Sequence, residues 1–83
     1  MFANRSKTGA ANLLGGYIKT KRKELKISQR KLADNLQVLG IIIDKNAVQR
    51  IEAGKRFLTD VEIPFFAKAL GVSIIDMYEN AER

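Results

Sequence analysis

Residues that typically start or end helices recur along this chain and divide it into short segments. Ser28 and Asp44 each precede a stretch of helical periodicity, as N-capping residues do. Glycine stands where such stretches end, at Gly40, Gly54 and Gly71. The sequence contains one proline, so most of the backbone between these positions is free to be helical. The pattern predicts an all-α fold of short helices.

Apolar residues recur at helical spacing within each segment, so five amphipathic helices are expected. Thr59 and Glu62 have the spacing of a capping box for the fourth helix. A cap at Asp60 is favoured instead, because it brings Pro64 closer to the first turn, where proline costs less. The predicted helices cover about residues 13–24 after an Asn12 cap, 29 to 37 or 39, 45–53, 61–70 and a short stretch after Ser73.

The inward faces of these helices define the predicted core. In the first helix the spacing of Leu14, Ile18 and Leu25 keeps one face buried. The other expected inward residues are Leu32, Ala33, Leu36, Val48, Ile51, Ile63, Phe66, Ala67, Leu70, Ile74, Met77 and Tyr78.

Two short segments depart from regular amphipathic helices. Gly15 and Gly16 weaken the first turn of the first helix, and close packing of another backbone there would explain them. Residues 41–43 are three consecutive isoleucines, which favours extended backbone before the third helix. At least one of them is expected to be exposed, as is Ile75, which falls off the inward stripe of the fifth helix. Such residues form a dimer interface in one interpretation and are isolated surface residues in the other.

The chain is predicted to hold one domain. Residues 1–11 are small and polar and are interpreted as a flexible N-terminal arm, whereas residues 12–83 carry the helical periodicity. A chain of 83 residues provides one modest core, and the sequence shows no internal repeat or low-complexity tract.

The residue types that the chain lacks exclude several function classes. Neither cysteine nor histidine is present, so the sequence offers no disulfide, no thiolate metal site and no histidine base or ligand. It contains no phosphate-binding glycine loop, and Ser28 and Ser73 are interpreted as helix caps rather than nucleophiles. No apolar run approaches the roughly 20 residues of a membrane-spanning helix. We therefore expect a cytoplasmic protein that is not an enzyme and needs no cofactor or metal.

The charge of the chain is unevenly distributed. The net charge is +6, but residues 1–56 carry 13 Lys and Arg against 4 Asp and Glu, a net charge of +9. Residues 57–83 carry 2 basic and 5 acidic residues, a net charge of −3. This polarity favours a polyanion such as nucleic acid on one side of the molecule, although a solvated lysine-rich surface gives the same composition.

Three motifs occur in a characteristic order along the chain. They are Ser-Gln-x-x-Leu-Ala at residues 28–33, Ile-Glu-x-Gly-Lys at residues 51–55 and Ala-x-Ala-Leu-Gly-Val-Ser at residues 67–73. Together they resemble the XRE family of helix-turn-helix regulators, which includes the phage repressors and Cro proteins. The resemblance covers about residues 12–80. It implies a compact five-helix, lambda-repressor-like domain in a bacterial or phage protein associated with the nucleoid.

The resemblance also implies which residues contact double-stranded DNA. The third helix of such a domain enters the major groove with its amino end first. Arg and Lys can donate to guanine, and Asn and Gln can pair with adenine. The implied base contacts are Lys45, Asn46, Gln49 and Arg50. The implied phosphate contacts are Gln29, Arg30, Lys55 and Arg56.

A structural ion pair and a longer turn complete the comparison with the family. Arg22 and Glu52 resemble the internal salt bridge that joins the first helix to the third and holds the third in place. Gln29 and Glu52 are 23 positions apart, which is more than in the short-turn phage repressors. The extra residues lie in the segment 38–44, so a lengthened turn before the recognition helix is expected.

These observations predict a sequence-specific transcriptional regulator that acts as a repressor and binds its operator as a homodimer. A second hypothesis is a protein-interaction module of the same fold, such as an antitoxin, whose partner is another protein. A third is non-specific binding of nucleic acid through charge alone, with a steep salt dependence and no sequence preference.

Overall fold

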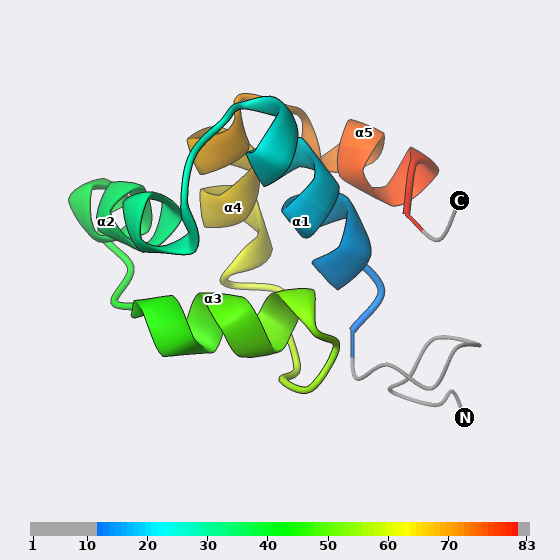
Figure 1. Cartoon of the computed structure of the whole chain (residues 1–83). Coiled ribbons are helices and arrows are strands. Elements are labelled where there is room, and N and C mark those ends of the chain that lie inside the picture. The colour runs from blue at the N-terminus through cyan, green and yellow to red at the C-terminus, as the bar shows by residue number, and fades with distance from the viewer. Residues whose placement is uncertain (1–11, 82–83) are drawn as a thin grey trace.

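The computed structural model describes residues 12–81, and the predicted arm at residues 1–11 lies outside the described residues. The helices are α1 (Gly15–Glu24), α2 (Gln29–Leu39), α3 (Lys45–Glu52), α4 (Ile63–Leu70) and α5 (Ile74–Glu79). The connection between α3 and α4 is longer than the others, and Figure 1 shows α3 lying along one side of the other helices. Helix α3 packs against α1 and α2, whereas α4 packs against α1, α2 and α5. The all-α, five-helix prediction is confirmed over this part of the chain.

Three of the helices begin at the predicted caps. The Ser28 hydroxyl accepts a hydrogen bond of 3.0 Å from the main-chain N–H of Lys31, and Asp44 Oδ1 accepts one of 2.8 Å from Ala47. Ser73 caps α5 in the same way. Each cap satisfies one of the N–H groups that a helix leaves unpaired at its start. Gly40 and Gly71 end α2 and α4 in the left-handed conformation, as predicted.

Two helix starts differ from the prediction. Helix α1 begins at Gly15 rather than directly after Asn12, although Asn12 Oδ1 still accepts a hydrogen bond from the Gly15 N–H. The Asp60 cap is wrong, because α4 begins at Ile63. Thr59 and Glu62 instead form the reciprocal bonds of a capping box just before the helix. Pro64 lies in the first turn of α4, where its missing N–H costs the helix no hydrogen bond.

The core lies between all five helices and includes the turn before α3. Most of the predicted inward residues are buried, but Leu25, Ile74 and Tyr78 are 44%, 40% and 46% exposed. A domain of this size has too little interior to cover every apolar side chain on its terminal turns and last helix. The buried core residues are Leu14, Ile18, Leu32, Ala33, Leu36, Ile43, Val48, Ile51, Phe66, Ala67, Leu70 and Met77.

The lengthened turn between α2 and α3 is anchored by one of its isoleucines. Ile43 is buried in the core, whereas Ile42 is 92% exposed, which confirms that the segment holds at least one exposed isoleucine. The anchor directly precedes the Asp44 cap, so it fixes the place where α3 begins.

The two glycines of α1 have different surroundings. A Cβ atom on Gly15 would collide with the main-chain oxygen of Ile51 in α3, whereas one on Gly16 would meet no atom within 4 Å. The close backbone packing expected for this pair is therefore found at Gly15 alone. Helices α1 and α3 approach each other at this point more closely than any side chain would allow.

Among the described residues, none of the helices combines the length and the apolar character that crossing a membrane requires.

Candidate nucleic-acid interface

Helix α3 has one buried and one exposed face. Val48 and Ile51 point into the core and are fully buried. The polar residues on the opposite side of the helix are exposed, so they form a surface that no other part of the described chain covers. This outward face of α3 consists of Lys45, Asn46, Gln49 and Arg50.

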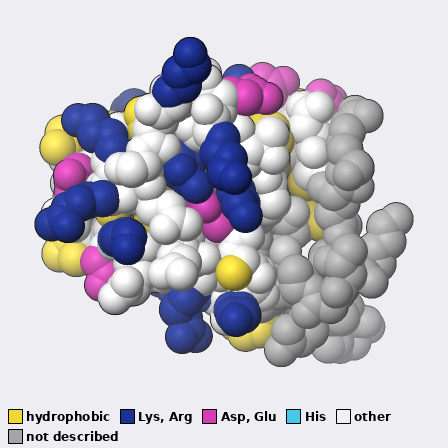
Figure 2. All heavy atoms as spheres, viewed as in Figure 1, with side chains coloured by type: hydrophobic (Ala, Val, Ile, Leu, Met, Phe, Trp, Pro, Cys, Tyr) yellow, Lys and Arg dark blue, Asp and Glu magenta, His cyan; other side chains and the backbone are white. Residues whose placement is uncertain are grey.

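Basic side chains surround this helix on the same side of the molecule. Figure 2 shows Lys and Arg side chains spread over the surface where α1, α2 and α3 lie. Residues of α2, including the exposed Arg30, and the first residues of α3 line an open groove of about 300 Å³. The groove includes Lys45 and Asn46, so the two helices form one continuous surface there.

Arg22 of α1 and Glu52 of α3 lie in contact and are buried. Arg22 Nε is 2.7 Å from Glu52 Oε2, and Nη2 is 3.0 Å from Oε1, so the pair is bidentate. The guanidinium also donates to the main-chain oxygen of Ile27 at 2.8 Å. The hydrogen bonds to Glu52 raise the pKa of Arg22 further above its ordinary value. The cluster joins the carboxyl end of α3 to α1 without an unpaired buried charge.

Gln29 extends this cluster to α2. Its Nε2 donates a hydrogen bond of 3.1 Å to Glu52 Oε1, so three helices meet at one carboxylate. Gln29 is also the first residue of α2, next to the Ser28 cap. The side chain is half-buried and therefore combines contact with α3 and a position at a helix amino end, where anions are stabilised.

The two basic residues after α3 differ in their surroundings. Lys55 is exposed, whereas the guanidinium of Arg56 makes hydrogen bonds of 3.0 and 3.1 Å to the carboxylate of Glu62. Burial alone would raise the pKa of Glu62, but hydrogen bonds from Arg56 and Thr59 outweigh it and hold that pKa below its ordinary value. Arg56 therefore ties the segment after α3 to the start of α4, and its proposed phosphate contact would have to share the guanidinium with Glu62.

The residue types in the sequence did not predict two interactions near the end of α3, the Arg56–Glu62 ion pair and the long-range hydrogen bonds of Asn12. Opposite charges on either side of the Thr59 turn are compatible with an ion pair between Arg56 and Glu62, but spacing alone does not specify it. The Asn12 side chain donates to the main-chain oxygens of Ile51 and Arg56, which are 39 and 44 positions away. Because these acceptors are backbone atoms, no residue type marks them.

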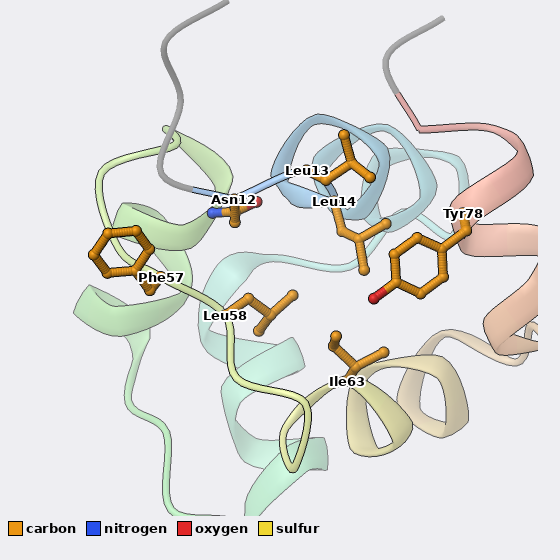
Figure 3. Close-up of a pocket in the computed structure, with 7 residues that line it drawn as sticks. All are labelled: Asn12, Leu13, Leu14, Phe57, Leu58, Ile63 and Tyr78. Atoms are coloured by element: carbon orange, nitrogen blue, oxygen red, sulfur yellow. The ribbon is translucent and has the colours of Figure 1, made fainter. Parts of the chain in front are cut away.

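A hollow of about 220 Å³, lined by Asn12 and by apolar side chains, lies near the carboxyl end of α3 (Figure 3). Leu13 and Leu14 line it from the segment just before α1, Phe57 and Leu58 from the segment after α3, and the Tyr78 ring from α5. Phe57 and Tyr78 are 51% and 46% exposed, so the hollow opens to the surface. Within residues 12–81 no group of three or more acidic, histidine or cysteine side chains is placed to hold a metal ion.

Comparison with known proteins identifies the family of the chain. Residues 18–77 match the model of the helix-turn-helix family HTH_3, and this range includes α2, α3 and the turn between them. No curated protein and no solved structure matches the chain significantly. The match covers most of the sequence and agrees with the five-helix fold. The chain therefore belongs to the XRE-type helix-turn-helix family, whose members bind DNA.

Proposed function

We propose that this protein is a sequence-specific transcriptional regulator that reads the major groove with α3 and acts as a repressor. The observation that carries the proposal is the outward face of α3, which is polar and exposed while the opposite face is locked into the core. An α-helix fits the major groove, and these side chain types match the donors and acceptors of base edges. Repression follows from occupancy, because a bound protein excludes polymerase from the same DNA.

The proposed contacts fall into two classes. Lys45, Asn46, Gln49 and Arg50 are proposed to contact bases. Phosphate contacts are proposed for Gln29, Arg30, Lys55 and Arg56, which lie at the start of α2 and after the end of α3. Phosphate contacts fix the register of the protein on the duplex, and base contacts select the sequence.

Selection from random DNA duplexes at near-physiological salt tests the proposal directly. Enrichment of a palindromic motif with half-sites about one helical turn apart supports an operator-binding regulator. Retention of DNA without any motif, combined with a steep loss of affinity as salt rises, would show that binding is driven by charge alone.

Substitution of Arg50 by alanine is expected to relax base preference at one operator position by about 1–3 kcal/mol, because a base contact is lost. Substitution of Lys55 by alanine should instead weaken binding to all sequences equally and reduce the salt slope by about 1, because one phosphate contact is lost. Affinities for the operator and its single-base variants, measured at several salt concentrations, distinguish the two results. A uniform loss for Arg50→Ala would remove Arg50 from the base-contacting set.

The regulator is proposed to bind as a homodimer. The eight residues of α3 span about two turns and reach few base pairs, so a second copy is needed to recognise a full operator. The exposed apolar side chains around the hollow, Leu13, Phe57 and Tyr78, supply a surface that a second copy would cover.

Phe57→Lys is expected to shift the protein from dimer to monomer, because a charge in an apolar interface is costly to bury. Sedimentation equilibrium measures the change. Ile42→Lys is the matched control, since Ile42 is more exposed and lies on the turn at the other end of α3. If Ile42→Lys dissociates the dimer and Phe57→Lys does not, the interface lies at the lengthened turn instead.

A further inference from the structure

The side chain of Asn12 connects the beginning of α1 to the end of α3. Its Nδ2 donates hydrogen bonds of 3.0 Å to the main-chain oxygen of Ile51 and 2.8 Å to that of Arg56. Its Oδ1 accepts from the Gly15 N–H, so the amide group makes three hydrogen bonds. Figure 3 shows Asn12 between the start of α1 and the segment that follows α3.

The two acceptors of Asn12 stand on either side of the turn that carries Lys55. The N–H of Lys55 closes this turn by donating to the main-chain oxygen of Arg50 at 2.8 Å. Gly54 lies within the turn in the left-handed conformation, with φ of 75°. A single side-chain amide therefore holds both ends of a short segment whose middle is exposed.

The same place is where α1 and α3 come closest. Gly15 leaves room for the main-chain oxygen of Ile51, and that oxygen also accepts from Asn12. A shift of the carboxyl end of α3 would therefore break the Asn12 bonds and change the backbone contact together. The Arg22–Glu52 pair secures the helix, but it does not reach the turn beyond it.

The geometry points to Asn12 as a positioning residue for DNA binding. Through its two donated hydrogen bonds it fixes the turn at the end of α3, and so sets where Lys55 meets a phosphate. Asn12 needs no contact with DNA for this role. The inference rests on the proposed phosphate contact of Lys55 and adds a residue that no motif marks.

Asn12→Asp is the sharpest variant. The carboxylate keeps an oxygen to accept from Gly15, so the start of α1 is retained, but it cannot donate to either carbonyl. Asn12→Ala removes both donated bonds, and the accepted bond from Gly15 as well, without adding a negative charge near DNA, and so controls for that charge. Leu70→Val controls for loss of stability, because Leu70 is buried in α4 and contributes nothing to the turn.

The experiment is a double-mutant cycle on the affinity for duplex DNA, with thermal melts of each variant. In the wild-type and Leu70→Val backgrounds, Lys55→Ala should lower affinity about fivefold, as expected for one phosphate contact near physiological salt. In both Asn12 backgrounds the loss should fall to about twofold or less, because Lys55 is no longer held in place.

The cycle separates this inference from the function that it rests on. An undiminished loss in both Asn12 backgrounds would show that Asn12 serves stability alone. Wild-type protein that binds every duplex equally would overturn sequence-specific reading, yet the cycle would still report on Asn12, since phosphate contacts do not depend on sequence. If Lys55→Ala has no effect in the wild type, the positioning role is overturned together with that contact.

Discussion

Arg22→Met is expected to lower the free energy of unfolding by about 3–5 kcal/mol, because it leaves the carboxylate of Glu52 buried without its charged partner. The side chains of the pair are 10% and 2% exposed, so water cannot replace the lost hydrogen bonds. Gln29 still donates to the carboxylate, but a single amide does not neutralise its charge. Small domains have total stabilities of about 5–15 kcal/mol, so the loss is large. Urea denaturation followed by circular dichroism measures it.

The double variant Arg22→Met with Glu52→Leu is the informative control. Replacing both charges by apolar side chains of similar size removes the unpaired carboxylate, so most of the lost stability should return. DNA affinity should then fall despite restored stability if the ion pair also sets the angle of α3. Equal instability of the single and double variants would show that the geometry of the pair, rather than an unpaired charge, dominates its effect.

Gly15→Ala is expected to lower the free energy of unfolding by about 3 kcal/mol, the upper part of the range for overpacked sites. The added Cβ atom would meet the main-chain oxygen of Ile51, and a backbone atom cannot rotate away as a side chain can. Helix α1 would have to separate from α3, so the DNA affinity should fall as well. Denaturant melts and operator titrations of the same preparation check both effects.

Gly16→Ala is the matched control on the same turn. Its Cβ atom would enter open space, so the higher helix propensity of alanine should raise stability by about 0.5–1 kcal/mol. The two variants therefore differ in sign although the glycines are neighbours. A stabilising effect at both positions would contradict the close approach of α1 and α3.

Local signals in the sequence predicted most of the fold. The serine and aspartate caps and the glycine stops act within one turn of the backbone, so they can be recognised without knowing the tertiary structure. The predicted start of α4 was wrong because the reciprocal bonds between Thr59 and Glu62 close a turn at residues 59–62, so the helix begins after that turn and not after Asp60. The prediction that Tyr78 is buried was wrong, because burial depends on which neighbours cover the last helix.

The candidate site was less accessible to sequence reasoning. The outward face of α3 follows from helical periodicity, and the contact between Arg22 and Glu52 was expected only through family resemblance. The hydrogen bonds of Asn12 could not be predicted, because their acceptors are backbone oxygens brought close by the packing of α1 on α3. Long-range contacts to main-chain atoms leave no pattern in residue types.

The separation of α3 into a buried anchoring face and an exposed polar face has an evolutionary consequence. Its attachment to the scaffold depends on Val48, Ile51 and Glu52, whereas its exposed polar positions take no part in the core. Substitutions at such surface positions usually change stability by no more than about 0.5 kcal/mol. New operator preferences can therefore arise by single substitutions on this face without a loss of folded protein, and descendants of one gene can diverge in their targets while their architecture stays the same.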